Sequence, residues 1–126
     1  MTEDWFLVAI AEVEETADRA SERLRAARDV VALAKADRLA GIGLVHIADR
    51  LARDGAEPRR LAAAAFHDYE HAVARLRSGV VRTLVDEEGV TLSALARHMG
   101  LSRQVVTRLY DSGAPGPTAG RLGPRQ

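Results

Sequence analysis

A glycine lies between two short amphipathic segments in residues 91–110 (TLSALARHMGLSRQVVTRLY), and it limits how the chain can fold there. Gly100 stands where the chain must reverse, in a left-handed backbone conformation that costs a residue with a side chain about 1 kcal/mol or more. Ala96 lies four residues earlier, and its small side chain lets the second segment cross the first. The pattern therefore predicts two short helices that meet at a sharp turn.

The apolar residues of this stretch have the spacing of helices that face a common core. Ser102 precedes the second helix, and its hydroxyl can accept a hydrogen bond from a free backbone N–H of the first turn. Two such helices cannot bury a core alone, so the last turns of the preceding helix should complete a three-helix unit near residues 76–112. The predicted core positions are Leu92, Leu95, Met99, Leu101, Val106 and Leu109.

This stretch resembles the helix-turn-helix DNA-binding regulator superfamily. Its GLSRQ turn is similar to that of small actinobacterial and phage regulators in which a long helix runs into such a module. The resemblance covers about 35 of the 126 residues. An ordinary helical hairpin that uses Ala and Gly for packing is the alternative interpretation.

The resemblance implies that the second helix of the motif enters the major groove. Arg103 and Gln104 lie at its start and are the expected base readers, because Arg can bridge guanine and Gln can bridge adenine. Thr107 and Arg108 lie one turn further and would contact a base methyl group or the backbone.

Three further residues are expected to hold phosphate. Backbone N–H groups near Ser102 would bind one phosphate, and Arg97 and His98 of the first motif helix would contact another and fix the register. The predicted DNA-binding residues are therefore Arg97, His98, Ser102, Arg103, Gln104, Thr107 and Arg108.

The charge distribution agrees with this placement. The net charge is +0, which argues against a general nucleic-acid coat protein. Residues 1–54 carry 11 acids and 8 bases, whereas residues 89–126 carry five arginines against a single acid, Asp111. The basic end of the chain is thus the end that contains the motif.

The N-terminal half predicts a long helix that begins among Thr2, Glu3 and Asp4, where acids favour a helix start. Apolar residues then recur at steps of four and three, which indicates either a coiled-coil-like pairing of two copies or the core stripe of a helical bundle. The positions are Phe6, Ile10, Val13, Ala17, Ala20, Leu24, Ala27, Val31 and Ala34.

Along this helix the acids precede the bases. An antiparallel homodimer would set Glu14 near Arg28 or Lys35 of its partner, whereas a parallel one would place acid on acid. The same order also suits the helix dipole. The homodimer is expected, and the sequence leaves its orientation open.

Glycines and a proline predict where the long helices break. Gly41 and Gly43 indicate an interruption after the first helix, Gly55 a left-handed end to a second, and Pro58 the start of a third that continues through Val85. The expected division is a helical oligomerisation region at 1–56, a long helix leading into the DNA-binding motif at 57–112, and a flexible tail at 113–126.

Composition and motifs point away from catalysis. Cysteine is absent, so a disulfide framework and a cysteine metal site are excluded. His67 and His71 lie one helical turn apart but lack an obvious third ligand, and no nucleophile turn or phosphate loop is recognisable. We therefore expect no enzyme activity, no catalytic residues, no metal and no cofactor.

The apolar stretch Trp5 to Ile10 is too short for a membrane span and lacks a cleavage pattern, so a cytoplasmic, nucleoid-associated protein is expected.

The expected fold class is all-α, with long N-terminal helices followed by a three-helix DNA-binding unit. The expected function is that of a sequence-specific transcriptional regulator that binds double-stranded DNA as a homodimer. The alternative is a helical adaptor, or a partition or transcription-complex protein, that uses the motif for protein contact.

Overall fold

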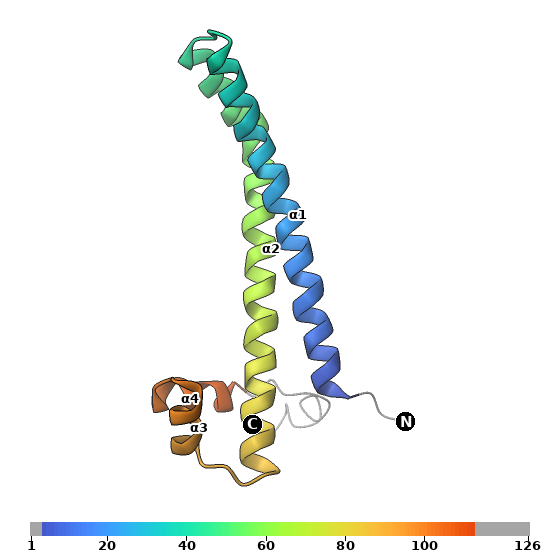
Figure 1. Ribbon diagram of the computed structural model, residues 1–126, viewed down its shortest axis with the longest axis vertical. Helices are drawn as coiled ribbons and strands as arrows, with labels where there is room; N and C mark the ends of the chain where they lie inside the picture. The colour runs from blue at the N-terminus through green and yellow to red at the C-terminus, as the bar shows by residue number, and fades with distance from the viewer. Residues whose placement is uncertain (1–3, 113–126) are drawn as a thin grey trace. The chain divides into compact units, whose positions relative to one another are not determined.

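The computed structural model describes residues 4–112, which form four helices (Figure 1). They are α1 (Trp5–Leu39), α2 (Leu44–Asp86), α3 (Leu92–Met99) and α4 (Arg103–Asp111). No strand occurs within residues 4–112. The predicted all-α fold with two long N-terminal helices is confirmed, and the predicted flexible tail, residues 113–126, lies outside the described residues.

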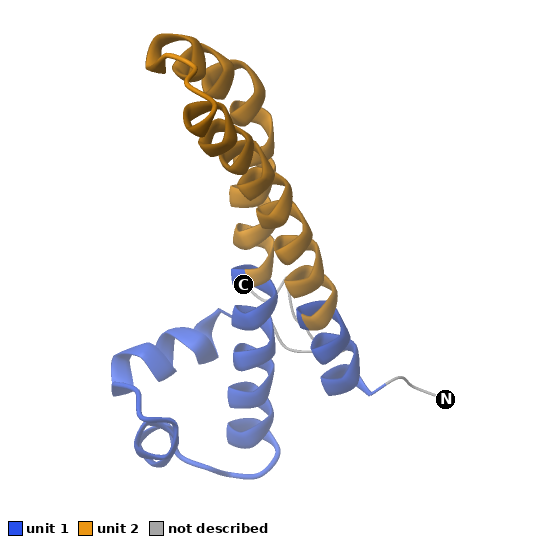
Figure 2. Ribbon diagram, turned by 45° about the horizontal axis from the view of Figure 1, so that its top comes forward, with its two compact units in different colours: residues 1–13, 70–126 blue, residues 14–69 orange. Residues whose placement is uncertain are grey.

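The chain divides into two compact units (Figure 2). One, here called the hairpin unit, is Glu14–Tyr69; the other, here called the terminal unit, combines Met1–Val13 with Glu70–Gln126. Both α1 and α2 contribute a segment to each unit.

The prediction of a helix end at Gly55 and a new start at Pro58 is wrong, because α2 runs through both positions. Gly55 lacks the positive φ of a helix-ending glycine. A Cβ built on it would lie 3.5 Å from Val30 Cγ1, an ordinary van der Waals distance, so this position faces α1 inside the continuous helix. Pro58 removes one backbone donor from the helix interior, and packing against α1 on this face explains why the helix continues.

The predicted interruption at Gly41 and Gly43 is confirmed. Gly41 has φ 91°, and its N–H donates to the Arg38 carbonyl at 3.0 Å, which closes the end of α1. The two helices then run antiparallel through the hairpin unit (Figure 1).

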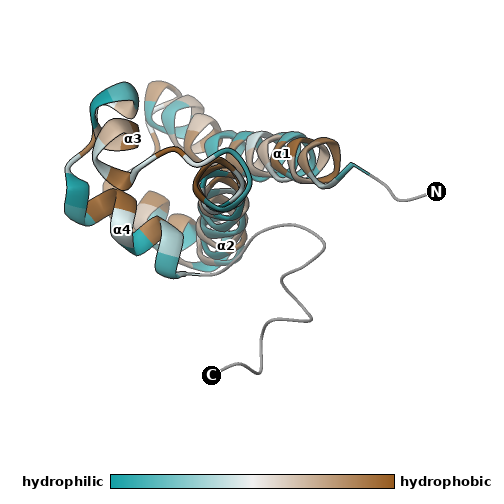
Figure 3. Ribbon diagram, turned by 90° about the horizontal axis from the view of Figure 1, so that it is seen from below, coloured by the Kyte–Doolittle hydropathy of each residue, from teal (hydrophilic) through white to brown (hydrophobic). Residues whose placement is uncertain are grey.

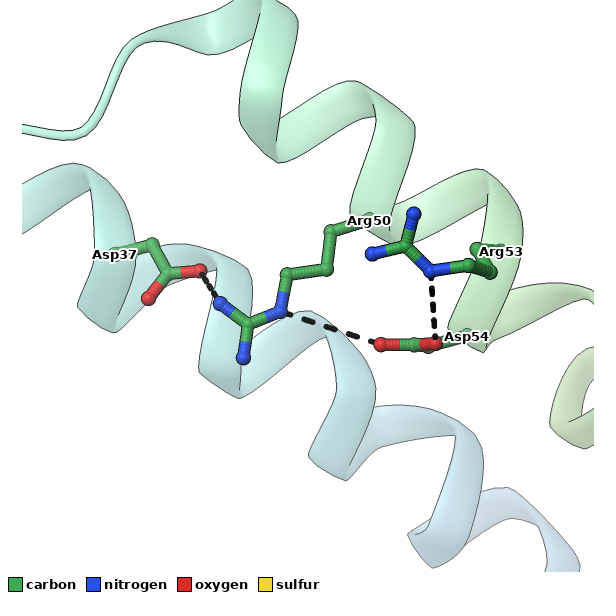
Figure 4. Close-up of polar contacts among 4 residues, drawn as sticks. All are labelled: Asp37, Arg50, Arg53 and Asp54. Atoms are coloured by element: carbon green, nitrogen blue, oxygen red, sulfur yellow. Dashed lines mark hydrogen bonds and ion pairs between the residues drawn. The ribbon is translucent and has the colours of Figure 1, made fainter.

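Polar side chains join the two helices beside this turn (Figure 4). Arg50 of α2 donates to Asp37 of α1 at 2.6 Å and lies 4.0 Å from Asp54. The Arg53 side chain approaches the other oxygen of Asp54 at 3.8 Å. Because both Arg50 and Asp54 are substantially exposed, these pairs orient the helices more than they stabilise them.

The hairpin unit has a small core. Its buried residues within the described chain are Thr16, Ile47 and Ala65. Of the predicted N-terminal stripe, Leu24 and Val31 remain exposed at 64% and 62%. The α1–α2 pair therefore leaves Leu24 and Val31 uncovered, and self-pairing stays a prediction.

In the terminal unit, the start of α1 packs against α2. The Asp4 carboxylate accepts a hydrogen bond from the Phe6 N–H at 2.9 Å, as expected for an acid at the helix start. The Trp5 ring lies over Gly79, where a Cβ would be 2.5 Å from it. Glu12 and Arg75 form an ion pair between the same two helices.

Candidate nucleic-acid interface

The α3 helix has a defined cap at each end. Thr91 precedes it and its hydroxyl accepts the Ala94 N–H at 3.1 Å. Gly100 ends it in the left-handed conformation, with φ 68° and ψ 30°. The Leu101 N–H then donates back to the Ala96 carbonyl at 3.0 Å, which satisfies an acceptor left open by the end of the helix. The predicted sharp turn at Gly100 is therefore confirmed.

Ser102 begins α4 in the predicted role of cap. Its backbone is extended, and its Oγ accepts the Val105 N–H at 3.1 Å. The turn is thus only two residues long between the last residue of α3 and Ser102, because Gly100 reverses the chain at once.

Three helices share one core in the terminal unit. Val81 of α2, Leu95 and Ala96 of α3, and Val106 of α4 are buried together. The partly buried residues packed against them are Leu84, Val85, Val90, Leu92, Met99, Leu101, Leu109 and Tyr110. All six core positions predicted for the motif belong to this cluster, and so does the end of α2. The expected three-helix arrangement is confirmed.

Burial of Val106 at 0% fixes which face of α4 points away from the core. Arg103, Gln104 and Arg108 are exposed and Thr107 is half-buried. These four side chains together line an open concavity of about 510 Å³. Figure 3 shows the resulting mixture of polar and apolar segments along α3 and α4. The four residues that the sequence assigns to base and backbone contact therefore form one continuous surface, here called the α4 surface.

The α4 surface carries charge that other residues do not neutralise. Within residues 4–112, neither Arg103 nor Arg108 has an ion-pair partner. Arg97 and His98 are also exposed, in the last turn of α3. The first-turn N–H groups of α4 lack helical acceptors by the geometry of any helix start, which adds partial positive charge beside Ser102. The surface can therefore attract and hydrogen-bond an anion.

A contact between α4 and the end of α2 was not predicted. The Tyr110 hydroxyl donates to Asp86 Oδ1 at 2.8 Å, and the Arg82 guanidinium lies 4.5 Å from the centre of the Tyr110 ring. The hydrogen bond to Asp86 raises the pKa of Tyr110 most, followed by burial and the negative charge of that carboxylate. Sequence spacing gives no signal for this contact, since the partners are 24 residues apart.

A second such contact lies at the end of α4. The hydroxyls of Ser78 and Ser112 are 2.6 Å apart, and Ser112 donates to the Leu109 carbonyl at 2.9 Å. Ser78 can therefore donate to Ser112, and Ser78 is only 2% exposed. Together with Tyr110 this contact fixes the orientation of α4 on α2.

No group of three or more His, Asp or Glu residues within residues 4–112 has the arrangement of a metal site, and this includes the surroundings of His67 and His71. No helix in this part of the chain combines the length and apolar character that crossing a bilayer requires.

Comparison with protein-family models, curated proteins and solved structures finds no match to this chain. The α4 surface is therefore a candidate nucleic-acid interface because of its geometry and because residues 91–110 resemble a helix-turn-helix motif.

Proposed function

We propose that this protein binds double-stranded DNA in a sequence-specific manner as a homodimer and regulates transcription. The observation that carries the proposal is the α4 surface: four side chains able to contact bases or phosphates lie together on one exposed helix face. Binding to DNA requires no enzyme chemistry and no cofactor. A protein with this function would act at the nucleoid in the cytoplasm.

The dimensions of α4 fit the major groove. Its nine residues make a cylinder about 14 Å long and 10–12 Å wide, and the groove of B-DNA is about 12 Å wide. Because α4 begins at an exposed cap, its N-terminal end can approach the base edges first. Two contacts fix α4 to the rest of the terminal unit: Val106 is buried in the core, and the Tyr110 hydroxyl donates to Asp86.

Within this docking, each residue has a distinct role. Arg103 and Gln104 read base edges, because they occupy the first turn of α4 and both side chains are exposed. Thr107 and Arg108 lie one turn further along and contact a methyl group or a phosphate.

Phosphate contacts then fix the register of α4 in the groove. Arg97 and His98 approach the backbone from α3, and the N–H groups beside Ser102 hold a second phosphate. A pair of such units in a homodimer would read successive major-groove faces about 34 Å apart.

Salt titration tests DNA binding. Affinity for a random-sequence duplex, measured by fluorescence anisotropy between about 50 and 200 mM salt, should fall steeply as counterions are released. Arg108→Ala should reduce the slope of log affinity against log salt by about one unit if it contacts phosphate. Arg19→Ala removes the same charge from an exposed site in the hairpin unit and should leave the slope unchanged. Absence of salt-dependent binding would favour a protein-binding adaptor instead.

A further inference from the structure

The hairpin unit leaves an apolar groove open between its two helices. Ala17, Ala20, Ser21 and Leu24 line it from α1, and Arg59, Ala62, Ala63, Phe66 and Tyr69 line it from α2. Its volume is about 550 Å³. Two large apolar residues beside it are exposed, Leu24 at 64% and Phe66 at 56%. A groove of this size and composition can receive the apolar face of another helix.

The core of the hairpin unit is too small for two helices alone. Ile47 and Ala65 are the buried apolar residues in its 14–69 segment. Each fully buried aliphatic side chain contributes only about 1.5–3 kcal/mol, whereas ordering each residue costs about 1–2 kcal/mol of backbone entropy. Further burial of Leu24 and Phe66 would reduce this deficit.

We infer that the groove binds the hairpin unit of a second copy of this chain, and that the two hairpins form an antiparallel four-helix bundle with its two-fold axis near Ser21. This inference specifies the homodimer of the proposed function and does not depend on DNA binding. It involves both helices, whereas the sequence indicated α1 alone.

Charge order selects the antiparallel arrangement. Glu14 and Arg28 each lie seven residues from Ser21, about 10 Å along the helix axis, so a two-fold axis at Ser21 places each opposite the other. Asp18 and Arg25 lie three and four residues from it and face each other in the same way. At about 100° per residue, these four side chains and Ser21 share a sector of about 80° beside the groove. A parallel pair would instead oppose like charges.

The shared face of the two hairpin units is set by the position of the axis. An axis at Ser21 places residues 14–28 of α1 opposite the same residues of the second copy, a length of about 22 Å, and two packed helices are about 20 Å wide. The shared face is therefore about 440 Å² per partner, at the low end of specific interfaces, so we expect a dimer that charge order and close packing select. The alanines of the groove allow the close helix approach of such bundles.

Disulfide cross-linking tests the position of the axis. The chain contains no cysteine, so Ser21→Cys introduces a single thiol. An axis near Ser21 brings the two thiols within bonding distance, which requires Cα atoms roughly 4.4–6.8 Å apart. Mild oxidation of the full-length variant should give a covalent dimer rapidly. Ala26→Cys is the control, because Ala26 is exposed on the same helix about 140° away, and it should cross-link much more slowly.

Mass measurement tests the groove itself. Leu24→Glu should convert the full-length protein toward monomer at micromolar concentration in analytical ultracentrifugation. Leu33→Glu is the matched control, since Leu33 is similarly exposed at 57% and lies about 180° around the helix from Leu24. Glu14→Arg with Asp18→Arg should weaken the dimer, and adding Arg25→Glu and Arg28→Glu should restore it.

Three results would overturn the inference: a monomeric wild type, equal cross-linking of the two cysteine variants, or equal loss of dimer in both leucine variants. These outcomes are separable from failure of the proposed DNA binding. A monomer with salt-dependent DNA affinity would refute only the dimer, whereas a dimer of the expected geometry with no DNA affinity would refute only the DNA-binding assignment.

Discussion

Gly100→Ala should destabilise the terminal unit through backbone conformation alone. Gly100 has φ 68°, and no atom lies within 4 Å of the position that a Cβ would occupy. The new methyl group therefore meets no neighbour, but the left-handed conformation costs a residue with a side chain about 1–2 kcal/mol. A stiffer unfolded chain offsets about 0.4–1 kcal/mol of this cost. The expected net loss in the free energy of unfolding is about 1 kcal/mol.

Urea unfolding followed by tryptophan fluorescence can measure this loss. Trp5 is the only tryptophan of the chain, and its ring contacts Gly79 in the terminal unit. Thermal unfolding with the same fluorescence probe gives a second measure: a loss of 1 kcal/mol corresponds to a fall in Tm of about 4–8 °C for a unit of 60–100 residues. Gly100→Asn is the control, because Asn tolerates the left-handed conformation and should lose clearly less stability. Equal stability of Gly100→Ala and wild type, or an equal loss with Asn, would refute this reasoning.

Other contacts in the terminal unit give further predictions. Gly79→Ala should displace the Trp5 ring, because a Cβ would lie 2.5 Å from it. We expect a shifted fluorescence emission maximum and a loss of about 1–3 kcal/mol in the free energy of unfolding. An unchanged emission spectrum would contradict this packing. Tyr110→Phe should lower the urea midpoint slightly, since it removes an exposed hydrogen bond to Asp86. Because folding raises the pKa of Tyr110, the associated stability is present below the ordinary tyrosine pKa and is lost as the pH rises through the raised value. Unfolding curves across alkaline pH should show this loss in wild type and not in Tyr110→Phe.

The C-terminal helices could be predicted in detail because their signals are local. The left-handed turn after α3 requires a glycine, which Gly100 supplies, and the Ser102 hydroxyl accepts an N–H three residues later. Both features lie within a few residues of the chain. The apolar spacing of α3 and α4 likewise identified the shared core around Val106. The same locality explains the grouping of Arg103 and Gln104 on one exposed face, although their role in DNA binding stays a prediction.

The long helices were predicted less well because their packing depends on the partner helix. Gly55 and Pro58 are typical signals for a helix boundary, yet α2 continues through them. Contact with α1 accounts for this, since Gly55 meets Val30 across the pair. A single sequence does not show which residues of α1 will face α2, and the Tyr110 contact with Asp86 has the same non-local origin.

We propose that the α4 surface reads DNA sequence, and this can be measured directly. A preferred duplex can be selected from a random pool with the full-length protein, and affinity for this duplex can then be compared with affinity for random DNA. A lost bidentate base contact costs about 1–3 kcal/mol of discrimination, so Arg103→Ala or Gln104→Ala should reduce the ratio of the two affinities about 5- to 150-fold. Arg19→Ala should leave the ratio intact, and all variants should retain the helical circular dichroism of wild type. If the ratio is also unchanged in Arg103→Ala and Gln104→Ala, these residues do not read bases and the α4 surface does not supply sequence specificity.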